Sequence, residues 1–208
     1  MVIKFVLILT IPIFFITCKQ PENQQSKQAI KAKHFSKVAF VLYDNFDTAL
    51  LHSAISEVTA FYHCSAIVLP AQPLPSFAFY EPRQRYKADS LIKYQSGIAP
   101  EGIESVIGLT QKDISTSLDG KADWGIFGLG YCPGKACVIS VFRLRATTYG
   151  QYKERFIKVL LHELGHNQGL PHCNKSEFCL MADAKGTIAT VDKEKKWLCG
   201  HCRKLLSD

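Results

Sequence analysis

The 208-residue sequence contains no internal repeat, and its only compositionally biased segment is a polar stretch over residues 19–33. It also has no apolar run that spans a bilayer comfortably, since the most apolar run covers only residues 5–16. These absences exclude a repeat architecture and argue against a conventional membrane-spanning helix. With 47% hydrophobic and 21% charged residues, the chain is expected to form one globular domain that buries a core.

A nucleic-acid-binding motif is also missing. The formal net charge is +7, but the lysines and arginines are scattered, with small clusters within residues 83–87 and 193–196. A nucleic-acid-binding protein usually concentrates its basic residues on a recognisable motif. We therefore expect a solvated basic surface and no nucleic-acid partner.

The N-terminus resembles an export signal. Lys4 precedes the apolar run, Cys18 follows it, and a polar segment comes next. We therefore predict a signal peptide over residues 1–17, lipidation of Cys18 and a flexible tether over residues 18–36. This arrangement predicts an exported, membrane-anchored lipoprotein of bacterial type, with its folded domain outside the cytoplasm. An uncleaved anchor and a segment of ordinary structure are the alternatives.

The most informative segment covers residues 162–173 and reads H-E-x-x-H-x-x-G-x-x-H-C. His162 and His166 are four residues apart, so on a helix they share one face and lie about 6 Å apart along the axis. Two imidazoles in this arrangement can hold one Zn²⁺. Glu163 follows the first histidine and is placed to accept a proton from a zinc-bound water.

The end of the same segment supplies a third candidate ligand. Gly169 can end the helix with a positive φ and turn the chain back, which would bring His172 towards the other histidines. Three nitrogen ligands and one open position suit a hydrolytic zinc, whereas a structural zinc is closed by four protein ligands. The segment therefore predicts a catalytic zinc site.

This extended motif resembles that of the metzincin metalloproteases, and the cysteine directly after the third histidine narrows the resemblance. Cys179-Leu180-Met181 and, after seventeen residues, Cys199-Gly200-His201-Cys202 make the whole pattern similar to that of the archaemetzincin family. Five residues separate Cys173 from Cys179, one more than this family pattern leads us to expect. The resemblance implies an α+β, zincin/metzincin-like fold, with a mixed twisted sheet packed on an active-site helix and a small zinc-stabilised C-terminal subdomain.

The resemblance also implies a function, which is zinc-dependent hydrolysis of peptide bonds in a peptide or protein substrate. Glu163 would be the general base, a zinc-bound water the nucleophile, and Met181 the apolar Met-turn beneath the zinc. In metzincin-like folds the substrate adds as an antiparallel strand to a sheet edge. We predict that edge over residues 124–130, with Gly128, Leu129 and Gly130 binding substrate. The glycines of this segment either clear the way for an approaching backbone or permit a bulge.

Four cysteines near the C-terminus form a second set of candidate ligands, which are Cys173, Cys179, Cys199 and Cys202. In the family this set looks like a closed structural zinc site, whose metal stabilises a part with little core of its own. Disulfides are the competing interpretation, because an exported protein meets an oxidising compartment. We favour zinc, which gives two Zn²⁺ per chain. Cys132 and Cys137 flank a turn and form a local disulfide or remain thiols.

The remaining sequence predicts alternating strands and helices. Thr148 and Gln151 form a capping box for the helix that carries the zinc motif and runs to about residue 168. Asp47 can cap an earlier helix. Strands are predicted at residues 38–43, 65–69, 104–109, 124–129 and 138–144, and a further helix at residues 85–95. The order matches the zincin architecture and predicts an N-terminal subdomain over residues 37–170, followed by a C-terminal subdomain over residues 171–208, in a monomeric protein.

Two other functions fit part of the pattern. One is a catalytically restricted or inactive zincin-fold binding module, and the other is a cysteine-rich zinc-binding or redox protein. The intact Glu163 argues against the first, and the second leaves three histidines unexplained. No single acid is an evident partner for a substrate α-amine, so endopeptidase and aminopeptidase action both remain open. No tyrosine follows Tyr152, so the oxyanion-stabilising tyrosine of some metzincins has no counterpart here.

Overall fold

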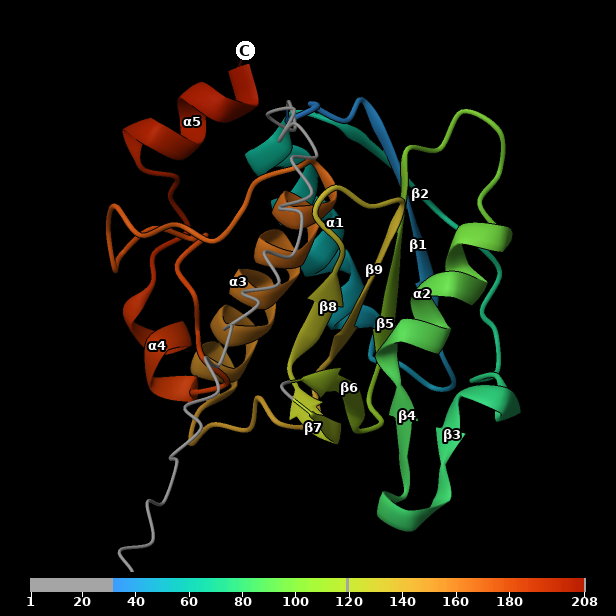
Figure 1. Ribbon diagram of the computed structural model, residues 1–208. Helices are drawn as coiled ribbons and strands as arrows, with labels where there is room; N and C mark the ends of the chain where they lie inside the picture. The colour runs from blue at the N-terminus through green and yellow to red at the C-terminus, as the bar shows by residue number, and fades with distance from the viewer. Residues whose placement is uncertain (1–31, 119, 208) are drawn as a thin grey trace, which may run out of the picture.

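The computed structural model describes residues 32–118 and 120–207, in which a central sheet lies between helices on both faces (Figure 1). Its strand order is β2-β1-β5-β9-β8, and β8, at one edge, is antiparallel to its neighbour while the other four strands are parallel. Cys18 and the predicted signal peptide lie outside the described residues. The strands are β1 (Lys37–Leu42), β2 (Ser65–Val68), β5 (Ser105–Thr110), β8 (Gly128–Gly130) and β9 (Ala136–Ser140).

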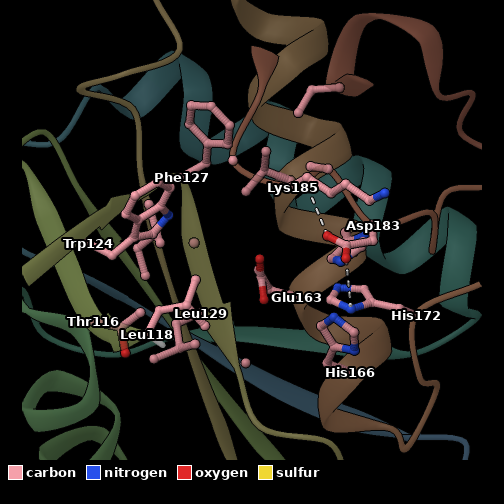
Figure 2. Close-up of a pocket in the computed structure, with 18 of the residues that line it drawn as sticks. Thr116, Leu118, Trp124, Phe127, Leu129, Glu163, His166, His172, Asp183 and Lys185 are labelled. Atoms are coloured by element: carbon pink, nitrogen blue, oxygen red, sulfur yellow. Dashed lines mark hydrogen bonds and ion pairs between the residues drawn. The ribbon is translucent and has the colours of Figure 1, made fainter. Parts of the chain in front are cut away.

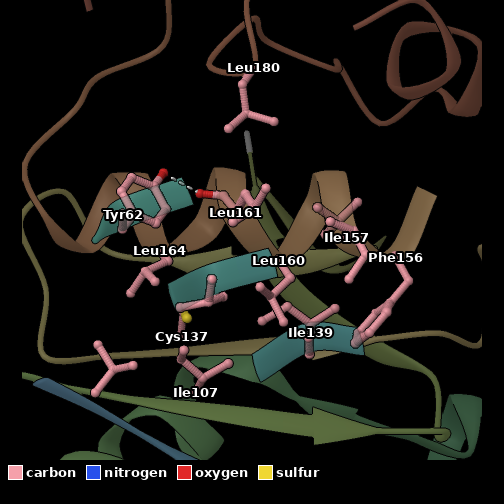
Figure 3. Packing of buried hydrophobic residues seen from close by; sticks show 14 of the residues in the cluster. Tyr62, Ile107, Cys137, Ile139, Phe156, Ile157, Leu160, Leu161, Leu164 and Leu180 are labelled. Atoms are coloured by element: carbon pink, nitrogen blue, oxygen red, sulfur yellow. Dashed lines mark hydrogen bonds between the residues drawn. The ribbon is translucent and has the colours of Figure 1, made fainter. Parts of the chain in front are cut away.

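Two separate apolar clusters fill the space on either side of this sheet. Helices α1 (Thr48–Tyr62) and α3 (Tyr149–Asn167) pack on one face, and α2 (Ala88–Gly97) packs on the other. Alternate residues of a strand point to opposite faces, so Phe40 joins the first cluster and Val41 the second. Figure 3 shows the first cluster, where leucines of α3 lie against the residues Ile107, Cys137 and Ile139 of the sheet.

Both predicted N-cap residues cap their helices, but the capping box is only half formed, because the Gln151 side chain donates to Asp192 Oδ2 at 3.5 Å. The side chain of Asp47 accepts a hydrogen bond from Ala49 N at 2.7 Å at the start of α1. Thr148 Oγ1 accepts from Gln151 N at 3.2 Å at the start of α3. Such caps satisfy amide groups that have no partner within the helix, which is why these short local patterns were readable from the sequence.

A second, four-stranded sheet has the order β3-β4-β6-β7. The predicted helix at residues 85–95 is wrong at its beginning, since these first residues form β4 and α2 starts at Ala88. The reason is tertiary pairing, because Tyr86 lies opposite Ile114 of the parallel β6. The strands are β3 (Phe79–Tyr80), β4 (Arg85–Lys87), β6 (Ile114–Leu118) and β7 (Lys121–Ile126), and two 3₁₀ turns, Ser76–Ala78 and Glu81–Arg83, flank β3.

The single strand predicted at residues 124–129 is also wrong, because the chain changes sheets at Phe127. Before this residue, Trp124 of β7 lies opposite Thr116 of β6 in the small sheet. After it, Leu129 of β8 lies opposite Val138 of β9 in the central sheet. Strand β6, which was not predicted, pairs antiparallel with β7 and so places β7 in the small sheet. The predicted sheet edge therefore belongs to β8 alone.

The segment before β1 is packed, which corrects the prediction of a flexible tether for residues 32–36. Lys33 N donates to Gln168 O at 2.7 Å, and Phe35 N donates to Gln168 Oε1 at 3.1 Å. Ala32 and Phe35 are buried. This segment therefore covers the C-terminal end of α3, where backbone carbonyls need partners.

After α3 the chain forms loops and two short helices, α4 (Ile188–Lys193) and α5 (Gly200–Ser207). Figure 1 shows this C-terminal part beside α3, on the side away from α2. Within residues 32–118 and 120–207, no helix combines the length and the apolar character needed to cross a membrane.

Candidate functional site

A cavity of about 680 Å³ lies between the two sheets on one side and α3, α4 and the loop after α3 on the other. Trp124, Phe127 and Leu129 line its first wall, and Figure 2 shows them facing Glu163 and the histidines. The cavity therefore joins the predicted substrate-binding strand to the predicted zinc motif.

The three histidines of the motif converge at this cavity. His162 and His166 come from α3 and His172 from the following loop, and one nitrogen of each lies within 4.8 Å of the others. Gly169 has a φ of 95°, which confirms that it ends the helix and turns the chain back. The arrangement fits a zinc ion bound by three nitrogens, with the fourth side facing the cavity.

Backbone carbonyls fix the orientation of the two helical imidazoles. His162 Nδ1 lies 2.7 Å from Leu180 O, and His166 Nδ1 lies 2.8 Å from Leu170 O. A carbonyl only accepts, so each Nδ1 carries the proton and each Nε2 is left free for a metal. Burial also lowers the pKa of His162 to about 3 and that of His166 to about 4, so both rings are neutral at neutral pH. Metal ligation requires this neutral form.

His172 is the more exposed ligand candidate, with 51% of its side chain accessible. Asp183 Oδ2 lies 4.0 Å from its Nδ1, and Asp183 Oδ1 accepts from Lys185 N at 2.8 Å (Figure 2). The loop that follows Met181 thus places a carboxylate behind the third imidazole, where it can orient the ring.

Glu163 lies between the histidines and β8. Burial raises its pKa to about 8; the backbone amide of Gly130 acts in the opposite direction, and Glu194 adds to the rise. A divalent cation at the histidines would favour the ionised carboxylate, the form that accepts a proton. The position therefore suits a general base that depends on a metal for its charge.

The glycines of β8 allow this strand to pack closely against α3. This role differs from both sequence-based interpretations, which were an open path for a substrate backbone and a β-bulge. A Cβ at Gly128 would lie 2.7 Å from Glu163 Cγ, and one at Gly130 would collide with the backbone carbonyl of Glu163. Real Cβ atoms do not come so close to other heavy atoms, so only glycine lets the strand pack this closely against α3. The glycines thus set the distance between the strand and Glu163.

The four C-terminal cysteines form a second cluster, with sulfur atoms within 4.8 Å of one another. Cys173 Sγ lies 3.6 Å from Cys199 Sγ, and Cys179 Sγ lies 3.8 Å from Cys202 Sγ. Tetrahedral zinc with Zn–S bonds of about 2.3 Å separates its sulfurs by about 3.8 Å, whereas a disulfide needs about 2 Å. The distances fit zinc, and the additional residue before Cys179 does not prevent convergence.

Met181, the residue predicted to form the Met-turn, lies close to both clusters. Met181 is fully buried, and its sulfur lies 2.6 Å from the position of a Cβ built on Gly165, one residue before His166. Cys173 N donates to Met181 O at 2.6 Å. Met181 therefore packs under the histidines as an apolar floor, and its backbone holds the first ligand of the cysteine cluster.

The other cysteines do not form the local disulfide that was one of the two sequence-based alternatives. Cys132 is exposed and Cys137 is buried in β9, and both are free thiols, as is Cys64. The disulfide is excluded because the Cys137 side chain faces the core beneath α3 (Figure 3).

Sequence reasoning missed Glu194, which lines the cavity with only 4% of its surface exposed. Burial raises its pKa to about 8, Lys158 opposes the rise and Asp183 adds to it. In the sequence this glutamate stands among lysines and has the appearance of an ordinary surface residue. Only the position of α4 against α3 brings it to the cavity, so no local signal could have revealed it.

Known proteins share both the sequence pattern and the fold. Residues 28–208 match the family model of peptidase family M54. The chain is 34% identical over 154 residues to an archaemetzincin of Haloquadratum walsbyi, which covers 70% of this chain and 84% of that protein. The crystal structure of archaemetzincin from Methanopyrus kandleri superposes with a TM-score of 0.71 and 28% identity, over 84% of this chain and 94% of that one. The structure from Archaeoglobus fulgidus, complexed with malonate, gives 0.69 and 25%, over 82% and 99%.

These relatives contradict the predicted localisation. The archaemetzincins of Haloquadratum walsbyi, Halobacterium salinarum and Methanopyrus kandleri are archaeal proteins, whereas the prediction relied on a lipoprotein signal of bacterial type. The prediction of an exported protein held at a membrane by lipid on Cys18 is therefore wrong.

Proposed function

Because the chain belongs to peptidase family M54, the archaemetzincins, and is a zinc-dependent peptidase, we propose that His162, His166 and His172 hold its catalytic zinc and that Glu163 is its general base. One observation carries this assignment, which is the convergence of three imidazole nitrogens within 4.8 Å at a cavity that Glu163 also lines. The carbonyls that hold two of the rings support it further.

Each group at the site has a separate role in the proposed reaction. When bound, zinc supplies a Lewis acid that activates water and polarises the substrate carbonyl. Glu163 accepts the proton of the attacking water and passes it to the leaving amine. The glycines of β8 bring the strand against Glu163, so that strand, base and scissile bond have a fixed separation. Met181 keeps the space beneath the histidines apolar and filled.

We propose that the substrate backbone pairs antiparallel with β8, through Gly128, Leu129 and Gly130. Three observations support this position. These residues line the cavity, β8 is the terminal strand of the central sheet, and among the described residues its only strand partner is β9. An unpaired strand edge next to the base offers the backbone hydrogen bonds that hold a peptide in extended form.

We propose a second zinc at Cys173, Cys179, Cys199 and Cys202, which gives two per chain in a monomeric protein. The separations of 3.6 and 3.8 Å between its sulfurs support the closed tetrahedral geometry of a structural site. On this proposal residues 171–208 form a subdomain that depends on its metal for stability. Elemental analysis of the purified protein should give two zinc ions per chain, and one zinc with two disulfides by mass would contradict the proposal.

Replacing Glu163 by Gln tests the catalytic assignment. The Glu163→Gln protein should retain two zinc ions and lose cleavage of a peptide library by at least about 100-fold, because general bases contribute about 10²–10⁴ in rate. Glu177→Gln is the matched control, since Glu177 is exposed and pairs with Lys193 outside the cavity. Wild-type activity in the Glu163→Gln protein would refute the mechanism. A wild-type protein that binds zinc and peptides without cleaving any would favour the binding-module alternative.

A further inference from the structure

Glu194 is a buried carboxylic acid that the proposed reaction does not use. It lines the same cavity as Glu163, and only 4% of its surface is exposed. Its Oε1 atom has no hydrogen-bond partner within the described part of the chain. An unpaired buried carboxyl group is costly, and nearly all such groups in folded proteins have partners. A ligand of the cavity that donates hydrogen bonds would satisfy it.

Two lysines close to Glu194 or in the cavity wall make contacts with other groups. Lys158 Nζ donates to Val191 O at 3.2 Å and to Asp192 O at 3.3 Å, and it also lies 3.6 Å from Glu154 Oε1. Lys121, which lines the cavity, holds its ammonium 4.5 Å from the centre of the Trp124 ring. Within the described residues no lysine or arginine forms an ion pair with Glu194. Its carboxyl group is therefore available to a cation that comes with the substrate, and such a cation would favour the ionised form against the effect of burial.

The walls of the cavity beside Glu194 are apolar. Val159 of α3 and Val191 of α4 line it and are almost fully buried. A lysine or arginine side chain buries its methylene groups along apolar surface and places its charge on a polar group at the end. The combination of two valines and one unpaired carboxyl group matches this kind of side chain.

The direction of β8 indicates which substrate residue reaches this place. A Cβ at Gly128 would contact Val159, and one at Gly130 would approach Asn167, so β8 runs in the same direction as α3. A substrate antiparallel to β8 therefore runs from the Asn167 end towards the Val159 end. The contacts of Lys158 with residues 191 and 192 place α4 at that same end. The residue that follows the cleaved bond thus lies on the side of Glu194.

We propose that Glu194 determines specificity by binding the ammonium or guanidinium group of a basic side chain on the substrate residue that directly follows the cleaved bond. This inference rests on the proposed function, and in particular on the antiparallel pairing of the substrate with β8. The carboxyl group touches the side chain of the leaving half of the peptide and takes no part in the proton transfers.

The test compares peptides that are acetylated at one end, amidated at the other and differ only in the residue after the cleaved bond. Lysine and norleucine are the key pair, because norleucine keeps the straight apolar stem and lacks the ammonium. The zinc-loaded wild-type protein should prefer lysine by at least about tenfold in kcat/KM, the range of a hydrogen bond between charged groups. In Glu194→Gln the ratio should fall to about one, and in Glu177→Gln it should equal the wild-type ratio. Equal rates for both peptides in the wild type, or an unchanged ratio in Glu194→Gln, would overturn the proposal.

A binding measurement separates this proposal from the proposed function. Peptides that begin with lysine or norleucine, like the leaving half of the substrate, are titrated into zinc-loaded Glu163→Gln protein by calorimetry. The lysine peptide should bind at least about tenfold more tightly, and adding Glu194→Gln should remove the difference. If the lysine peptide binds more tightly but the wild-type protein cleaves no peptide, only the proposed function is refuted. If the wild-type protein cleaves peptides but the lysine peptide does not bind more tightly, only the role of Glu194 is refuted.

Two further measurements address a variant that does not fold and a second possible source of the ammonium group. If Glu194→Gln does not fold, Glu194→Asp retains the charge but withdraws it by one methylene, and the preference should shift from lysine towards the longer arginine. Substrates with a free instead of an acetylated amino terminus test the other source of an ammonium group. Glu194→Gln could abolish a preference for the free amino terminus and leave the preference for lysine unchanged. In that case Glu194 binds the α-amino group of the substrate, and its assignment to a basic side chain is wrong.

Discussion

The two clusters of candidate metal ligands both lie within residues 162–202, yet they are built differently. The histidines border a cavity of about 680 Å³, with His172 half exposed. The cysteines are all at least 91% buried, since the most exposed of them, Cys173, retains 9%. A site that leaves one position open to solvent can exchange water for substrate, whereas a closed site can only stabilise the chain around it.

The support beneath each cluster differs as well. Two of the three histidines lie on α3, whose buried face packs on α1 and the central sheet, and carbonyl groups orient these two rings. The cysteines lie on loops and on α5, where regular structure is short. We therefore expect the loss of metal to affect chemistry at the first site and folding at the second.

The largest expected effect is on activity, from His166→Ala. The variant should lose one zinc per chain and all measurable peptidase activity, because two imidazoles are too few for a catalytic site. Its thermal midpoint should change by only a few degrees, since α3 remains packed on the sheet. Cooperative unfolding at a much lower temperature would show that the comparison between the two sites is wrong.

The next effect is on stability, from Cys199→Ser. This variant should also lose one zinc, but its free energy of unfolding should fall by several kcal/mol, because the binding energy of a structural zinc is largely folding energy. Denaturation in urea, followed by circular dichroism, measures the change. A midpoint equal to that of the wild type would indicate that residues 171–208 fold without their metal.

Gly128→Ala tests the spacing between β8 and the base without touching either ligand set. The new Cβ would lie 2.7 Å from Glu163 Cγ, so strand or side chain must shift. We expect a loss of about 100-fold in kcat/KM, since small misplacements cost that much, and about 1–3 kcal/mol of stability. Gly97→Ala is the control, because a Cβ there meets nothing within 4 Å. Equal activities of the two variants would contradict the role given to the glycine.

The smallest expected effect is on stability, from Tyr62→Phe. This tyrosine lies in the core next to the helix that carries two of the histidines. Tyr62 is buried, and its hydroxyl donates to Leu161 O at 2.7 Å, next to the first ligand (Figure 3). Losing this hydrogen bond should cost about 1 kcal/mol, with both zinc ions retained. Tyr149→Phe, at an exposed tyrosine, should leave the urea midpoint unchanged. A zinc content below two in Tyr62→Phe would show that the histidine site depends on this bond more than packing alone implies.

The parts of the structure that the sequence predicted are those encoded by neighbouring residues. Asp47 and Thr148 cap their helices through residues two and three positions away, and Gly169 ends α3 within the motif itself. The spacing of the histidines similarly depends on one turn of helix. Such signals need no knowledge of the rest of the chain.

What the sequence did not reveal depends on partners far away in the chain. The change of sheet at Phe127 follows from pairing with β6 and β9, and the position of Glu194 follows from the packing of α4 on α3. Pairing partners and helix packing are set by the whole core, so a local pattern cannot specify them. The apolar run before Cys18 was also a local pattern, and the location that it predicted is contradicted by the archaeal relatives.

One backbone contact links the geometry of the two clusters. Cys173 pairs with Ala182 in a parallel bridge and donates to Met181 O, and His172 directly precedes it in the chain. A fixed Cys173 therefore restricts the position of the third histidine. The buried cysteine cluster thus anchors the half-exposed His172, so rigidity at one cluster limits movement at the other.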